Sequence, residues 1–218
     1  MHCPRLSLFS LALLLIVGSA GQALVSEESD PLAQLPKLPP RLELTFHTER
    51  HLSIFPEALH SQGSLVIDRP AAAVRWHFNG EVTLILVGDH LRRFDPQGAE
   101  ERIHLARDPS AQSLKRQMIA FRDGDWAGLL EWFRPRTISE TQAKADAEAG
   151  HRRLHLEPVD QELSRLITSI VIVSEIATAA PVLVEVQSAN GDTTAYRFDP
   201  PSLPEELDPV IFQGPPGD

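Results

Sequence analysis

Apolar and polar residues alternate along much of this chain, and this period of two limits its fold more than any other feature. Leu42, Leu44 and Phe46 are separated by polar neighbours, which is typical of a strand with one buried face. The same alternation returns at Ser64–Asp68, Val74–Phe78, Ile103–Leu105, Leu154–Leu156 and Thr194–Phe198. The sequence therefore predicts a protein built mainly of antiparallel strands.

Two stretches are apolar without alternation. Val82–Val87 is apolar on both faces, so we expect a strand covered on both sides. Leu166–Val186 could be taken for a membrane helix, but Glu175 and Pro181 interrupt it and β-branched residues dominate it. Two strands with a turn near Thr178–Pro181 are the favoured interpretation.

A hairpin signal joins the last two predicted strands. Asn190-Gly191 lies between the runs Val182–Gln187 and Thr193–Phe198. Because this dipeptide tolerates positive φ, we expect a type I′ turn there.

Only the middle of the chain has helical spacing. Leu114, Met118 and Phe121 in Ala111–Phe133 fall at i, i+4 and i+7. After a break at Asp123-Gly124-Asp125, which could serve as a hinge, the apolar face continues through Trp126, Leu129, Leu130 and Phe133. About eleven antiparallel strands with a helical pair inserted midway predict a mainly β fold with some α, an incomplete (open) antiparallel β-barrel.

The first residues resemble a secretion signal. One basic residue, Arg5, precedes the apolar run Leu6–Val17, and small residues such as Gly21 and Ala23 suit a cleavage site. The run is too short to span a bilayer, so we expect cleavage and a soluble periplasmic protein. The expected organisation is residues 1–23 signal peptide, 24–40 proline-rich arm, 41–212 open-barrel domain and 213–218 flexible tail.

Composition and motifs argue against several functions. The formal net charge is −10, from 20 Lys and Arg against 30 Asp and Glu, without a basic cluster for nucleic acid. Cys3 is the single cysteine, which excludes a disulfide framework and a cysteine zinc site. His47 and His51 lack the metalloprotease pattern, and no phosphate loop or nucleophile elbow is present. We expect no enzyme activity, no cofactor and no metal.

Several short motifs then occur in an order that resembles the LolA family of periplasmic outer-membrane lipoprotein carriers. Gly124-Asp125 with Leu129 and Phe133 is more similar to a divergent LolA-related branch. The matching pieces are the segments 46–52, 63–70 with Arg75-Trp76, 88–91 with Phe94-Asp95-Pro96, 154–158, and 191–194 with Phe198.

The resemblance implies an open β-barrel with a helical lid, which agrees with the pattern of strands. It implies a monomeric carrier of an acylated lipoprotein or lipid cargo, taken from an inner-membrane extraction complex and passed to an outer-membrane acceptor. Candidate cargo-binding residues are Phe46, Trp76, Phe78, Met118, Phe121, Trp126, Leu130 and Phe133. Arg69 of the Arg-Pro motif would gate the lid.

A purely structural role is the alternative for each of these residues. The apolar candidates could be plain core, and Arg69 could be a surface arginine at a turn. The whole chain could instead be a periplasmic lipid-sensing or regulatory binding module, since related open barrels serve in that way.

Overall fold

The computed structural model describes residues 38–103, 109–123, 130, 132–159 and 161–214. Its strands form one antiparallel eleven-stranded sheet. The strands are β1 (Arg41–His51), β2 (Leu59–Asp68), β3 (Ala73–Phe78), β4 (Val82–Val87), β5 (His90–Phe94), β6 (Glu100–Glu101), β7 (Phe133–Arg136), β8 (His151–Pro158), β9 (Ile167–Glu175), β10 (Pro181–Ser188) and β11 (Thr193–Phe198). The helices are α1 (Pro109–Asp123), α3 (Glu140–Glu148), α4 (Gln161–Ser164) and the 3-10 helix η2 (Pro209–Phe212).

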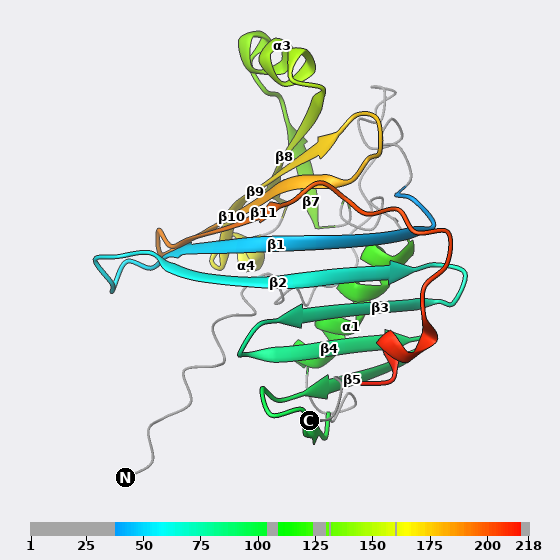
Figure 1. Ribbon diagram of the computed structural model, residues 1–218. Helices are drawn as coiled ribbons and strands as arrows, with labels where there is room; N and C mark the ends of the chain where they lie inside the picture. The colour runs from blue at the N-terminus through cyan, green and yellow to red at the C-terminus, as the bar shows by residue number, and fades with distance from the viewer. Residues whose placement is uncertain (1–37, 104–108, 124–129, 131, 160, 215–218) are drawn as a thin grey trace.

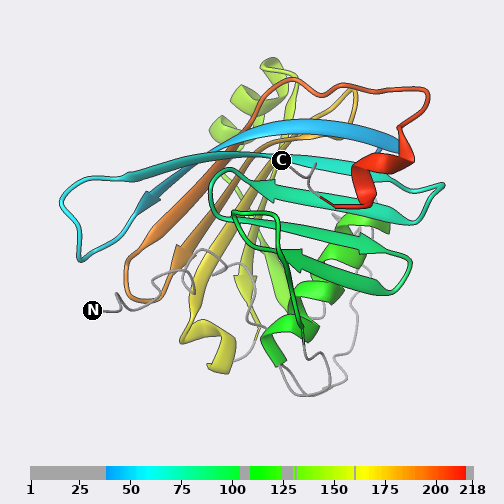
Figure 2. The ribbon, with the colours of Figure 1, turned by 60° about the horizontal axis from the view of Figure 1, so that its bottom comes forward.

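The sheet consists of two meanders joined in its middle. Strands β1 to β6 follow one another, as do β7 to β11, and β1 pairs with β11 between them. The edges are therefore β6 and β7, and the chain passes from one edge to the other through α1. The sheet curves, and α1 lies against one side of β3 and β4 (Figures 1 and 2). We call the side that carries α1 the inner face. The predicted open, curved antiparallel sheet with helical cover is confirmed.

Alternation along each strand divides the sheet into two packed faces. On the inner face, alternate residues of β1 such as Leu42, Leu44 and Phe46 join a large core together with Leu114 and Met118 of α1. Residues in between point to the outer face, where a smaller cluster forms. Each face therefore has its own apolar cover.

The smaller cluster is covered by the C-terminal segment, which we define as Asp199–Gly214. Ser202 forms a β-bridge with Glu43, and Arg41 donates a hydrogen bond to the carbonyl oxygen of Glu205. The segment includes η2, which lies on the side of β3 and β4 that faces away from α1 (Figure 1). The apolar residues brought together there are Val66, Ala73, Ile85, Phe94, Leu207, Ile211 and Phe212.

Most predicted strands are confirmed. The apolar stretch Leu166–Val186 forms β9 and most of β10, with the turn Ile176–Ala180 between them. Ile103, in contrast, lies outside the strands, because the chain leaves the sheet after the short edge strand β6. The predicted signal peptide, most of the arm, Leu105 and residues 124–129 lie outside the described residues.

The predicted second helix is wrong at its end. Phe133 begins β7, whose partner is Pro158 of β8, so edge pairing overrides the helical spacing. The helix α3 was not expected from spacing at all. Its cap explains it, since Ser139 Oγ accepts from Gln142 N, and Asp146 near its end binds Arg153 of β8.

The predicted hairpin between β10 and β11 exists, but its turn is not type I′. Gly191 has a φ of 89°, whereas Asn190 does not have positive φ. Gly191 N donates to Ser188 O, and Ser188 N donates to Asp192 O. This is a three-residue loop with glycine in the left-handed position.

No helix in the described part of the chain is long and apolar enough to cross a membrane.

Candidate ligand-binding face

Aromatic side chains gather on the inner face around Phe46. Its ring centroid lies 6.4 Å from that of Trp76 and 5.4 Å from that of Phe78, both edge to face. Trp76 and Phe78 stack on each other at 5.5 Å. The structure therefore brings these three predicted cargo residues, from β1 and β3, into one cluster.

Two further aromatic residues complete this cluster and were not singled out as candidates. Tyr196 and Phe198 of β11 each lie 5.9 Å from Phe46 between ring centroids. Pairing of β1 with β11 sets Phe46 opposite Phe198. The alternation of Tyr196 and Phe198 indicated that both side chains lie on one face of a strand. It could not show that this strand pairs with β1, because the local pattern does not identify the partner of a strand.

Gly63 of β2 leaves room for this cluster. It lies opposite Phe46 on one side and Phe78 on the other. A Cβ atom at Gly63 would lie 2.5 Å from Cζ of Phe46 and 2.1 Å from the carbonyl oxygen of His77. The Phe46 ring therefore occupies the place of the missing side chain.

Among the described side chains of helix α1, several apolar ones cover the inner face. Ala111, Leu114 and Met118 are buried, and Met118 is fully so. Phe133 is also buried, whereas Leu130 is partly exposed and packs against the same core. The side chain of Phe121 and the whole of Trp126 lie outside the described part.

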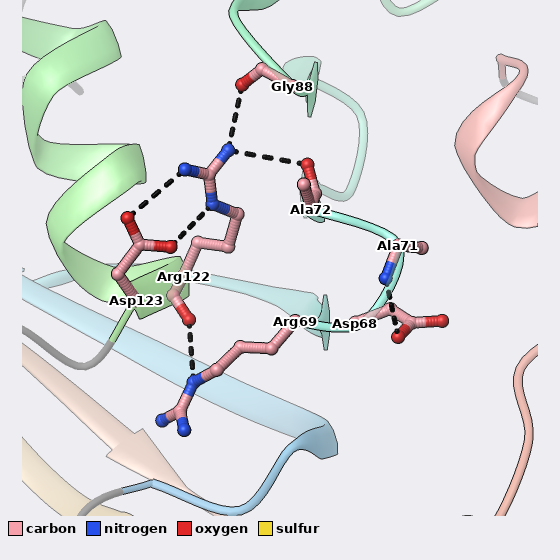
Figure 3. A network of polar contacts seen from close by, with 7 residues as sticks. All are labelled: Asp68, Arg69, Ala71, Ala72, Gly88, Arg122 and Asp123. Carbon is pink, nitrogen blue, oxygen red and sulfur yellow. Dashed lines mark hydrogen bonds and ion pairs between the residues drawn. The ribbon is translucent and has the colours of Figure 1, made fainter.

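The C-terminal end of α1 is held by polar contacts. Arg69 Nε donates a hydrogen bond of 2.9 Å to the carbonyl oxygen of Arg122, which is the next-to-last residue of α1 (Figure 3). Arg69 follows β2 in the turn to β3, where Asp68 Oδ1 accepts from Ala71 N. The arginine of the Arg-Pro motif thus touches the backbone of the covering helix.

Arg122 makes the reciprocal contacts from the helix to the sheet. Its Nη1 donates to the carbonyl oxygens of Gly88, at 2.7 Å, and Ala72, at 3.3 Å, in the β4–β5 and β2–β3 turns (Figure 3). Asp123 accepts from the same guanidinium, and this hydrogen bond raises the pKa of Arg122 above its ordinary value. We call Arg69 and Arg122, with their carbonyl partners, the arginine latch.

An ion pair also joins the middle of α1 to the sheet. Lys115 Nζ of α1 lies 3.5 Å from Asp89 Oδ1, beside Gly88. Asp89 is largely exposed, so this pair contributes little to stability. Among its described side chains, α1 is therefore attached both by buried apolar residues and by polar contacts that water can replace.

The inner face becomes polar at the opposite end of the strands. Past Phe46, β1 continues with Thr48, which is buried, and Arg50, whose Nη2 lies 3.4 Å from Glu81 Oε1. Tyr196 lies beside them, and burial raises its pKa to about 12. An amphiphile on this face would meet apolar side chains near Phe46 and polar ones near Arg50.

Metal-binding side chains do not form a cluster in the part of the chain described. Groups of three or more His, Cys, Asp or Glu with suitable placement are absent there.

Removing Arg122 should loosen α1 without unfolding the sheet. We expect Arg122→Leu to speed amide hydrogen exchange in α1 by on the order of tenfold, the effect of about 1.4 kcal/mol. Exchange in β9 and β10 should stay as in the wild type. Arg134→Leu, which changes an exposed arginine at the sheet edge, serves as the control. Equal exchange of α1 in both variants would show that Arg122 does not hold the helix.

Neither a scan against protein-family models nor a search of curated proteins finds a match for this sequence. Solved structures with some likeness include a LolA superfamily protein from Nitrosomonas europaea, 10% identical, with a TM-score of 0.44 over 84% of this chain and 94% of that one. MucB is 18% identical, with a TM-score of 0.44 over 84% of this chain and 59% of MucB, so the chain spans little more than half of it. A putative outer membrane lipoprotein-sorting protein domain from Vibrio parahaemolyticus is 10% identical, with a TM-score of 0.27 over 83% and 92% of the two chains.

Proposed function

We propose that this protein is a periplasmic carrier of acyl chains. It would bind the chains of a lipoprotein or lipid-like molecule on the inner face beneath α1 and deliver them to the outer membrane. An inner-membrane extraction complex would supply the cargo, and an outer-membrane acceptor would take it. The observation that supports this most is the apolar inner face whose helical cover ends in the arginine latch.

The physical argument starts from the cost of an acyl chain in water. Each exposed methylene costs about 0.8 kcal/mol, so a carrier must cover the chain with apolar surface. The aromatic cluster around Phe46 and the α1-covered surface with Leu114 and Met118 provide such surface. These side chains are packed together in the closed protein, so cargo would enter as α1 moves away.

The latch suits such movement. Hydrogen bonds from arginine to backbone carbonyls contribute modestly when water can replace them. Opening at Arg69 and Arg122 exposes polar groups that water solvates, whereas the apolar side chains of α1 give way to cargo. The helix can therefore open without disturbing the pairing of the strands.

The direct experiment is binding of a fluorescent fatty acid by the purified protein, followed by its transfer to acceptor vesicles. A carrier binds the probe and releases it to vesicles. Retention without release favours the lipid-sensing or regulatory module, and absence of binding contradicts both.

Arg69 offers a specific prediction for release. We expect Arg69→Leu to change the rate of transfer to vesicles about tenfold while the melting temperature shifts by only a few degrees. The reason is that Arg69 binds the helix backbone and lies outside the core. Arg197→Leu, at an exposed position of β11, is the matched control. If transfer by the Arg69 variant matches the wild type, the gating role is wrong.

A further inference from the structure

The hairpin between β1 and β2 carries the most exposed large apolar side chain of the described residues. Ile54 is 76% exposed and its neighbour Phe55 is 44% exposed. Leu59, where β2 begins, is also exposed. This hairpin extends beyond the rest of the sheet (Figures 1 and 2). We call Ser53–Pro56 the hairpin tip.

The tip is held in place by its surroundings. Ser53 N donates to Asp192 Oδ1 in the β10–β11 loop at 2.6 Å, and this hydrogen bond lowers the pKa of Asp192. Phe55 N donates to Leu52 O, and Pro56 limits the backbone that follows. The two apolar side chains are thus presented to solvent from a fixed turn, which reduces the entropy lost when they bind.

The charges near the hairpin tip argue against a negatively charged partner surface. The stretch His51–His60 contains the acid Glu57 and neither lysine nor arginine. Arg50, just before it, lies against Glu81. Since the whole chain has a formal charge of −10, anionic lipids would repel the protein rather than attract it.

The small apolar area of the hairpin tip favours a bilayer over a protein as its partner. A stable protein interface buries about 800 Å² on each side, whereas two or three side chains on a narrow projection offer a few hundred at most, roughly 150–250 Å² for a phenylalanine. A lipid interface needs no complementary surface, because apolar side chains dissolve in it one by one.

We propose that the hairpin tip inserts Ile54 and Phe55 into the surface of a bilayer with net-neutral, zwitterionic headgroups. This inference rests on the proposed carrier function, which it deepens by assigning the surface that meets the receiving membrane. The tip adjoins the polar end of the inner face, near Arg50, so docking there brings one end of the inner face to the lipid surface. The contact is weak and reversible, as a carrier that leaves again requires.

Vesicle flotation tests this directly. The chain from Leu24 onward, the expected mature form, is mixed with phosphatidylcholine vesicles, alone or with added phosphatidylglycerol. We expect the wild type to float with phosphatidylcholine, and added phosphatidylglycerol to leave binding unchanged or weaker. In Ile54→Asp/Phe55→Asp the partition coefficient should fall by about tenfold or more, the loss corresponding to removal of two inserted side chains.

The control variant is Leu203→Asp/Val210→Asp. These two side chains are 50% and 54% exposed on the C-terminal segment, so the same charge is added to similar apolar surface elsewhere. It should float as the wild type does, and circular dichroism should show both variants folded. Equal loss in both variants, no flotation of the wild type, or binding only to vesicles that contain an outer-membrane protein would each overturn the proposal.

Flotation and fatty-acid binding test the membrane-inserting tip and the carrier function separately. Flotation needs no cargo, and the tip variant should bind a fluorescent fatty acid as the wild type does. Absence of flotation with intact fatty-acid binding overturns the tip alone. Absence of fatty-acid binding with intact flotation contradicts the carrier function and leaves the lipid-binding tip standing.

Discussion

Ile172→Glu is expected to unfold the protein, whereas Leu130→Glu is expected to leave it folded and to abolish retention of an acyl chain. Ile172 lies in the middle of β9, paired with Val184 and Leu154, and is 6% exposed. A carboxylate there has no partner, so we expect a loss of about 4 kcal/mol or more. Such a loss is comparable with the whole stability of a typical domain, about 5–15 kcal/mol.

Leu130 differs because it packs against the core from its edge and keeps part of its surface exposed. A glutamate can turn toward water there, so we expect a cost of about 1 kcal/mol. The same charge would disfavour an acyl chain beneath the helical cover. Chemical denaturation and a fluorescent fatty-acid assay on both variants measure the two effects. If Leu130→Glu unfolds the protein as readily as Ile172→Glu, Leu130 belongs to the structural core and is not part of a lid.

Gly63→Val is the second change with a large expected effect. Any Cβ at this position would meet the backbone oxygen of His77 and the ring of Phe46, both well inside normal contact distance. The backbone oxygen cannot move without disturbing β3, and the ring is enclosed by its aromatic neighbours. We expect a loss of about 3 kcal/mol or more, at the upper end of overpacking costs.

The control for Gly63 lies on the same strand and face. Ser61→Val places a valine two residues away, opposite Thr48, at a position that is only partly buried. Its cost should stay within about 0.5 kcal/mol. Urea denaturation with parallel near-ultraviolet circular dichroism compares the two variants. Equal midpoints would mean that the sheet can yield at Gly63 and that the aromatic cluster is not tightly packed there.

Much of the sheet was predictable because one buried face imposes alternation. Leu42, Leu44 and Phe46 point to the inner core as expected, and the apolar run Val82–Val87 is largely buried because α1 and the C-terminal segment cover opposite faces of β4. Pro181 marks the start of β10, close to the expected turn. These features follow from local composition and need no knowledge of the partners.

Features that depend on distant partners were not predictable in this way. Phe133 continues the helical spacing, yet pairing with β8 makes it a strand. Tyr196 and Phe198 reach the aromatic cluster only because the first and last strands of the sheet pair with each other. Local spacing contains no information on either pairing.

The arginine latch also contains one residue that the sequence pointed to and one that it did not. Arg69 stood out through its resemblance to the Arg-Pro motif, and the structure places it on the backbone of α1. Arg122 had no such signal, because its role depends on the carbonyls of Ala72 and Gly88 in two turns. Ala72 has a φ of 50°, a conformation that is rare outside glycine. The neighbouring sequence does not predict this conformation.

The most direct measurement is mass spectrometry of the protein purified without added lipid from the cells that make it, first in its native state and then after organic extraction. The carrier account predicts a native mass above that of the polypeptide and the release of acyl or lipid-like molecules by the solvent. The Leu130→Glu variant, folded by circular dichroism, should lack this extra mass. A wild-type protein that carries nothing, and that binds no fatty acid when one is supplied, would contradict the account.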